Sequence, residues 1–231
     1  MAISRLRLDW TAFGYKDWGG ATQSFGLYVP AGSNRVLVVT IAGIGYTTFS
    51  NLRFNNLPLT LAVRRENSYN DVEIWYLLNP PAGSYTFTLP LGRTDAALGL
   101  ATYSGVDQSN PLYSIAGYDR YDRWHILGSC AYPKDGLVIH GGVNDCGNNG
   151  NAHMYYASGP MTRIVSQIVK TADGSNQWHV YQNMGEYIRS GAAGSQSWDM
   201  AIPYERNSQA VQAIFNPAPD TKRLCQVIWF D

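Results

Sequence analysis

Two carboxylates of this chain lie within apolar, strand-like runs: Glu73 in EIWYLL and Glu186 in NMGEYI. A pair of carboxylates is the minimum equipment of a glycoside hydrolase, and a retaining enzyme holds its pair about 5 to 5.5 Å apart. The other two of the four glutamates, Glu66 and Glu205, lie beside turns, and nothing in the sequence sets any two carboxylates on facing positions. Glycoside hydrolysis is therefore the weakest of three functional hypotheses, and we expect that the protein is not an enzyme.

Metal and nucleotide chemistry find little support in the other motifs. The four histidines, His125, His140, His153 and His179, show no HExxH or HxH pattern, so a metal site would require their convergence in the tertiary structure. Ser104 lies in TYSGVD and not in a GxSxG elbow, so it is interpreted as a turn residue. No Walker A loop and no GxGxxG motif follows a strand-like run. We expect no metal and no cofactor.

The three cysteines, Cys130, Cys146 and Cys225, are too few and too widely spaced for a disulfide framework, and an odd number cannot all pair within the chain. We interpret them as small buried side chains in a reducing compartment.

Residues 144 to 151, NDCGNNGN, are rich in oxygen atoms that could surround a calcium ion. Calcium sites use several carboxylates, and Asp145 is the only one here, so a Gly/Asn turn is the favoured interpretation. A lectin-like alternative would use Asn144 and Asp145 together with an exposed aromatic residue such as Trp178 or Trp124. In such a site, ring stacking on a sugar and hydrogen bonds converge in one groove.

The segment YDRYDRWH, residues 118 to 125, carries the residue types that dominate protein interfaces. On an extended chain successive side chains point to opposite faces, so Tyr118 and Asp119 face opposite ways. Three interpretations remain: a subunit or partner contact, a polar strand whose arginines pair locally with aspartates, and a platform for sugar stacking. The candidate contact residues are Tyr118, Arg120, Tyr121, Arg123 and Trp124.

Both ends of the chain are unusually apolar for termini. The N-terminal RLRLDWTAFGYKDWGG and the C-terminal LCQVIWFD carry large apolar side chains where domains usually fray. Exposure of Trp229 and Phe230 would be costly, so the C-terminus either pairs as a final strand or docks on another subunit. Thirteen arginines against four lysines also favour interfacial ion pairs over solvated surface charge.

The elements that must position these residues are strands. Short runs rich in β-branched and aromatic residues alternate with Gly, Asn and Pro turns, and no stretch sustains a capped helical pattern. RVLVVTIA (35 to 42) predicts a strand buried on both faces, and Asn55-Asn56 predicts a hairpin turn with Pro58 near a sheet edge. Further strands are expected at 84 to 90, 97 to 104, 135 to 143, 161 to 169, 197 to 204 and 208 to 215. The expected fold is all-β: an antiparallel two-sheet β-sandwich, jelly-roll-like, with no internal repeat of fixed period.

The most sharply patterned stretch is EIWYLLNPPAGSYTFTLP, residues 73 to 90. We predict a hairpin whose first strand is central and covered from two sides, and whose second strand has one wet face. Pro80 and Pro81 fix φ, and Gly83 supplies a conformation that proline cannot adopt.

Length and charge bound the possibilities. A chain of 231 residues fits one β-sandwich domain, with an N-terminal arm (1–20), a sandwich core (21–216) and a C-terminal strand or arm (217–231). The formal net charge of zero gives no field that would attract nucleic acid or an anionic membrane. We expect no signal peptide and no transmembrane segment, because no apolar run has the required length.

The succession VEIWYLLNPPAGSYTFTLPL, then AALGLATYSGVDQSNPL, resembles an uncharacterised β-sandwich family of phage and bacterial genomes. Members of that family share ELWYLxNPPAG and SGVDQxxPL elements and are often associated with virion structural genes. The resemblance spans roughly residues 22 to 218, is most specific between 72 and 112, and leaves 118 to 134 unmatched.

The resemblance implies a jelly-roll-like structural protein of a tailed bacteriophage: a capsid decoration or cement protein, or a head or tail fibre subunit. The implied partners are major capsid or tail proteins and further copies of the same chain, for example in a trimer. The implied localisation is the virion, after assembly in the host cytoplasm. The lectin-like module that binds host-surface glycans remains the alternative.

Overall fold

Seventeen β-strands and no helix form the part of the chain that the computed structural model describes. That part comprises residues 2–13, 22–44, 49–67, 70–90, 96–120, 125–145, 155–158, 161–172, 177–201 and 208–219. Every ladder between these strands is antiparallel, so the predicted all-β antiparallel class is confirmed. Within these ranges there is no helix with the length and hydrophobicity that crossing a membrane takes.

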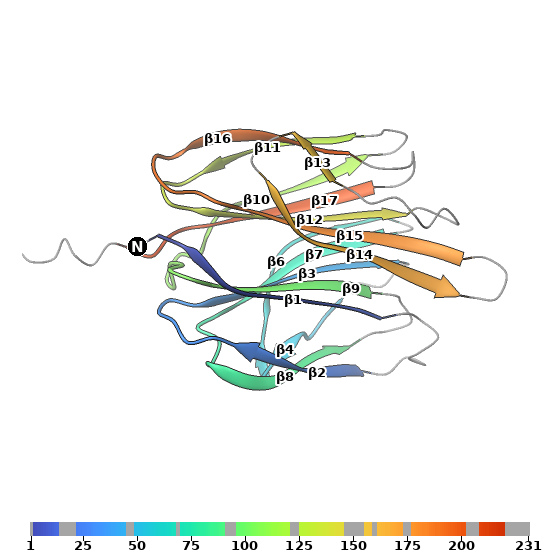
Figure 1. Ribbon diagram of the computed structural model, residues 1–231, viewed down its shortest axis with the longest axis horizontal. Coiled ribbons are helices and arrows are strands. Elements are labelled where there is room, and N and C mark those ends of the chain that lie inside the picture. Colours follow the sequence, from blue (N-terminus) through green and yellow to red (C-terminus); the bar gives the residue numbers. More distant parts are fainter. Residues whose placement is uncertain are drawn as a thin grey trace, which may run out of the picture.

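The strands form four sheets, which Figure 1 shows as four stacked layers. The first central sheet has the order β1 (Ser4–Phe13), β9 (Ala96–Ser104), β3 (Val36–Ile44), β7 (Asn70–Leu78), β6 (Thr60–Glu66). The second central sheet has the order β10 (Leu112–Arg120), β17 (Ser208–Phe215), β12 (Leu137–Asp145), β15 (Gln177–Ile188), β14 (Thr162–Ala172). The first outer sheet is β2 (Thr22–Val29), β8 (Gly83–Pro90), β4 (Arg53–Phe54), β5 (Leu57–Pro58), and the second outer sheet is β11 (His125–Tyr132), β16 (Gly194–Ala201), β13 (Tyr155–Ser158).

A layer of buried side chains separates each pair of neighbouring sheets. The central layer joins the two central sheets through residues such as Val38, Ile74, Ile139 and Phe215. A second layer lies between the first central and first outer sheets, and a third between the second central and second outer sheets. Central strands are therefore covered on both faces, which explains why RVLVVTIA and EIWYLL are apolar at consecutive positions. We expected two stacked sheets, and the described residues form four.

The segment predicted as a hairpin is instead a corner between two sheets. Strand β7 pairs with β3 and β6, whereas β8 pairs with β2 and β4. The corner is held by Arg35, whose Nε and Nη2 donate to the Pro80 carbonyl at 3.0 and 2.9 Å, and by Asn79, which adopts a φ of 46°. Gly83 has a φ of 127°, which favours glycine. The turn chemistry was predicted correctly, but strand pairing is set by the sheets on either side.

Two other local predictions are confirmed. Asn55 and Asn56 form the turn between β4 and β5 with φ values of 49° and 62°, and Pro58 lies on β5 at the edge of its sheet. At the N-terminus, Ser4–Phe13 pairs along β9 as the edge strand of the first central sheet.

The two halves of the chain repeat one strand order. Strands β1 to β9 form the first central and first outer sheets, and β10 to β17 form the second central and second outer sheets. The orders β1-β9-β3-β7-β6 and β10-β17-β12-β15-β14 coincide when the strands of each half are numbered in sequence and β4 and β5 together correspond to β13. The outer sheets, β2-β8-β4 and β11-β16-β13, coincide in the same way. We call these the first half and the second half.

The contacts between the halves are reciprocal. Strand β10 lies against β6 and, with the roles of the halves exchanged, β1 lies against β14. The pairs β17 with β7 and β12 with β7 likewise have their counterparts in β9 with β15 and β3 with β15. This pattern is that of a two-fold symmetric dimer made within one chain.

Irregularities of the ladders repeat as well. Strand β6 has a β-bulge between Leu61 and Val63, and β14 has one between Arg163 and Val165. Aligning these bulges makes the following residues equivalent along the ladders: Trp75 and Gly185, Val39 and His140, Leu100 and Gln212, Thr102 and Ile214.

A second pair of bulges then falls at the same place in both halves. The bulge residue of β1 is Leu6, next to Thr102 of β9, and that of β10 is Tyr113, next to Ile214 of β17. Bulges are specific features that are retained within a fold. The halves are therefore two copies of one structural unit, although no repeat is visible in the sequence.

Candidate functional site

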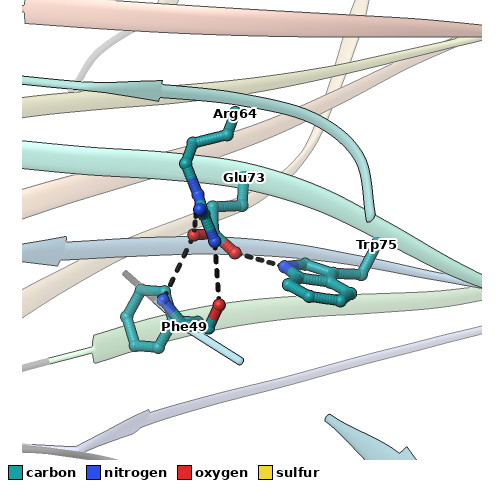
Figure 2. A network of polar contacts seen from close by, with 4 residues as sticks. All are labelled: Phe49, Arg64, Glu73 and Trp75. Carbon is teal, nitrogen blue, oxygen red and sulfur yellow. Dashed lines mark hydrogen bonds and ion pairs between the residues drawn. The ribbon is translucent and has the colours of Figure 1, made fainter. Parts of the chain in front are cut away.

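The first cluster that could do chemistry surrounds Glu73, which is 0% exposed on β7 (Figure 2). Its Oε1 accepts hydrogen bonds from Arg64 Nε at 2.6 Å and from the backbone N–H of Phe49 at 3.2 Å. Its Oε2 accepts a hydrogen bond from the indole N–H of Trp75. Arg64 is the register partner of Glu73 on β6, and its Nη2 also donates to the Phe49 carbonyl at 2.8 Å. The carboxylate thus has donors at both oxygens and a paired positive charge.

Asp71 lies two residues away on the same face of β7 and is 1% exposed. Burial, followed by the charge of Glu73 and a hydrogen bond to it, raises the pKa of Asp71 to about 9. Neither oxygen of Asp71 finds a donor among the described residues, and a buried carboxyl without donors favours its protonated form. Burial beside Glu73 thus favours the neutral form of Asp71 at neutral pH, while Arg64 is the ion-pair partner of Glu73.

Glu186, the second carboxylate noted from the sequence, belongs to a different cluster. It lies on β15 and accepts from Arg5 Nη1 at 2.6 Å and from the Tyr103 hydroxyl at 2.7 Å. Arg5 and Tyr103 belong to the first half, so this cluster links the two central sheets. Burial, then the charge of Glu186, raises the pKa of Tyr103 well above its ordinary value.

The third cluster lies between the second central and second outer sheets. His140 and Trp198 pack with ring centroids 4.3 Å apart, and the Trp198 indole N–H donates to Gln212 Oε1 at 2.8 Å. Burial lowers the pKa of His140 to about 3, so the imidazole is neutral at physiological pH. The places equivalent to His140 and Gln212 hold Val39 and Leu100 in the first half, and Phe87 is the fifth residue of β8 as Trp198 is of β16. All three are members of one apolar cluster. The second half thus replaces apolar packing with a polar group that needs specific partners.

The candidate interface segment is described only at its start. The Tyr118 hydroxyl donates to the Ser129 carbonyl at 2.9 Å, and its ring packs edge-on against Trp198. Asp119 lies on the opposite side and contacts Arg65 of the first half at 3.7 Å. The predicted alternation of Tyr118 and Asp119 is confirmed, and the charge partner that the described residues give to Asp119 is distant in sequence. Arg120 is the last residue of β10, and its side chain is outside the described set. The other candidate contact residues lie wholly outside the described residues: Tyr121, Arg123, Trp124, Trp229 and Phe230.

The residues of the lectin-like alternative lie on two paired strands. Asn144 is buried on β12, where its Nδ2 donates to Ser208 Oγ at 2.5 Å. We expected a turn to begin at residue 144, but β12 continues through Asp145 because Asn144 is paired on both sides, with Tyr181 and Ser208. Asp145 and Trp178 contribute backbone to β12 and β15, and their side chains lie outside the described set.

Except for Trp10, which lies in the apolar N-terminal segment, sequence reasoning missed the large apolar side chains that the described residues leave exposed. These lie on strands that pair on one side only, or on the first outer sheet: Trp10, Tyr28, Leu57, Tyr113 and Ile115. Tyr113 and Ile115 alternate with Ser114, which predicts a half-buried strand, but a sequence does not say which strand lies at an edge.

A scan against protein-family models gives no match, and searches of curated proteins and of solved structures give none at a significant level.

Proposed function

We propose that this protein is a structural subunit of a larger assembly, and that the assembly is the virion of a tailed bacteriophage. The observation that carries the proposal is where the charged and the apolar side chains lie. The carboxylates Glu73 and Glu186 have their partners inside the protein, whereas large apolar side chains face outward. Buried ion pairs with full hydrogen bonding hold structure in place. Exposed apolar groups on sheet edges mark surfaces that bind other proteins.

The strand order supports a finer proposal about the fold. In a jelly roll of eight strands, the first strand pairs with the last, the last with the third, and the third with the sixth, while in the other sheet the second pairs with the seventh and the seventh with the fourth. β1-β9-β3-β7 and β2-β8-β4 follow that order if β4 and β5 count as one strand, and the second half follows it too. We therefore propose two jelly-roll-like sandwiches in tandem, packed through their central sheets. The phage assignment rests on the resemblance of residues 72 to 112 to a family associated with virion genes.

Within the virion, the proposed roles are a capsid decoration or cement protein, or a head or tail fibre subunit. In each role the protein acts through the surfaces it buries against major capsid or tail proteins and against copies of itself. No substrate is involved.

The test is made on particles. Purified virions of a phage that encodes this chain are expected to contain it at a fixed copy number, measured by quantitative mass spectrometry. The chain expressed alone is expected to re-bind particles from a strain that lacks the gene. Absence from gradient-purified particles would refute the proposal. A glycan array measured in parallel identifies the lectin-like alternative, since binding to glycans without incorporation into particles would favour it.

A further inference from the structure

Strand β10 presents an apolar edge. It pairs with β17 on one side, and no described strand pairs with its other side. Tyr113 and Ile115 on this strand are 48% and 51% exposed. An unpaired edge with large apolar side chains is a template for the addition of another strand.

The equivalent strand of the first half is better covered. Leu8 of β1 is equivalent to Ile115, and it packs against the central layer. Strand β14, which lies against β1, has eleven residues, whereas β6, which lies against β10, has seven. The contact of β6 with β10 includes Arg65 Nη2 on the Gly117 carbonyl at 3.4 Å, two residues beyond Ile115. The same position of one repeated unit is therefore packed in one half and open in the other.

We propose that the C-terminal residues 220 to 231 of a second copy of this chain occupy that edge as an added antiparallel strand. The segment has the large apolar side chains that could cover such an edge: its twelve residues include Leu224, Val227, Ile228, Trp229 and Phe230. The inference rests on the proposed function, since it names one contact by which subunits of the assembly hold each other.

The position of residue 219 and the antiparallel direction of the added strand indicate that the segment comes from a second copy and not from the same chain. The chain leaves β17 at the Leu112 end of β10, because the Asn216 N–H donates to the Pro111 carbonyl at 2.8 Å. The Ala218 N–H then donates at 2.7 Å to the carbonyl of Gly105, which directly follows β9. From there the chain's own segment would run parallel to β10, whereas every described ladder is antiparallel.

The path that the same chain would need for antiparallel pairing is longer than residues 220 to 231 can span. It requires the segment to reach the Arg120 end of β10, about 30 Å away for nine residues, and to pair on the way back over another 30 Å. Twelve residues span at most about 43 Å. A segment from a second copy can enter from the Arg120 end directly, and reciprocal exchange between two copies gives a closed dimer.

The first experiment measures mass in solution by light scattering after size exclusion. We expect the full chain to have at least twice the mass of one chain, and a chain ending at residue 219 to have the mass of one. Because a truncation can unfold a protein, Ile115→Lys in the full chain is measured as well, with Leu57→Lys, at an exposed position on another edge strand, as its matched control. The first is expected to dissociate the oligomer and the second to leave it intact. A one-chain mass for the full chain, or an oligomer unaffected by both truncation and Ile115→Lys, overturns the inference.

The second experiment uses Cys225, which lies in the segment. In a Cys146→Ser background, Ser114→Cys is expected to give a two-chain disulfide band on a non-reducing gel, and Cys225→Ser is expected to abolish it. A disulfide confined to one chain would show that the segment docks on its own β10 and would overturn the exchange. Particle re-binding is assayed on the same variants. If truncation lowers the mass but no variant binds particles, only the proposed function is refuted. If the full chain has the mass of one chain and still binds particles, only the exchange is refuted.

Discussion

The hydroxyl of Tyr103 on β9 donates a hydrogen bond of 2.7 Å to Oε2 of Glu186 on β15, and so joins the two halves of the chain across their central layer. The same carboxylate takes its charge partner, Arg5, from the first half. The two central sheets are thus held by a specific polar contact at one side of a largely apolar interface.

Tyr103→Phe tests this link. The substitution keeps the ring but leaves Glu186 Oε2 buried with one donor fewer, which should lower the free energy of unfolding by about 1–3 kcal/mol. Urea denaturation followed by tryptophan fluorescence measures the change. Tyr28→Phe is the control, because the Tyr28 ring lies exposed beneath Arg7 and keeps that contact as phenylalanine. Equal effects of the two substitutions would contradict the role of the Tyr103 hydroxyl.

Arg64→Met should be the most damaging change in the cluster of Figure 2. It leaves the negative charge of Glu73 buried without its counter-ion, a loss of about 3–5 kcal/mol. Adding Glu73→Gln removes that charge, so the double variant should be more stable than Arg64→Met alone. A double-mutant cycle from denaturation midpoints measures the coupling. Additive losses would show that Arg64 and Glu73 do not depend on each other.

Asp71→Asn should change the pH dependence of stability. The pKa of Asp71 is about 9 in the folded protein and near 3.8 when unfolded, so the folded state binds the extra proton between those values. Its contribution to stability is complete below about pH 4 and is lost as the pH rises toward 9. Asparagine carries no such proton, so the decline in urea midpoint between pH 5 and 9 should be smaller in the variant. Asp9→Asn, in an exposed pair with Arg7, is the control and should leave that slope unchanged.

His140→Val should act at the other end of the pH range. The pKa of His140 is lowered from 6.5 to about 3 in the folded state, so the unfolded state binds the extra proton between these values. Stability from this group is complete above about pH 6.5 and is lost as the pH falls toward 3. Valine, the equivalent residue of the first half, removes this loss, and the midpoint of acid unfolding should move to lower pH. An unchanged acid midpoint, measured by circular dichroism, would exclude His140 as a cause of acid unfolding.

Gly99→Ala tests how closely the halves approach. A Cβ at residue 99 would lie 2.7 Å from Met184 Sδ and 2.9 Å from Thr40 Oγ1. Overpacking of this kind costs about 1–3 kcal/mol. Shortening the opposing side chain with Met184→Ala should remove part of the clash, so the two substitutions together should cost less than their sum. Gly26→Ala, where a Cβ would meet nothing within 4 Å, is the matched control for thermal unfolding.

Local chemistry explains what could be predicted from residues alone. Strand periodicity, the Asn55-Asn56 turn and the two-sided burial of RVLVVTIA depend on neighbouring residues, and the structure confirms all three. The alternation of Tyr118 and Asp119 is predictable for the same reason, since successive side chains of a strand point to opposite faces.

Strand partners, in contrast, depend on residues far apart in the chain. EIWYLLNPPAGSYTFTLP has the composition of a hairpin, yet β7 and β8 belong to different sheets, because β7 pairs with β3 and β6 whereas β8 pairs with β2 and β4. The internal repeat was hidden for a related reason. Val39, Phe87 and Leu100 correspond to His140, Trp198 and Gln212, so the two halves share backbone positions and bulges without sharing residue types.

The amino-acid order of this protein is enough to predict an all-β chain with its turns and doubly buried strands, because these follow from side-chain period and backbone preference over a few residues. The four-layer arrangement, the pairing of its halves, the enclosure of Glu73 and Glu186, and the exposure of Tyr113 and Ile115 are properties of the folded molecule. They arise when distant strands come together, and which face or edge is then covered depends on the lengths and positions of strands elsewhere in the chain.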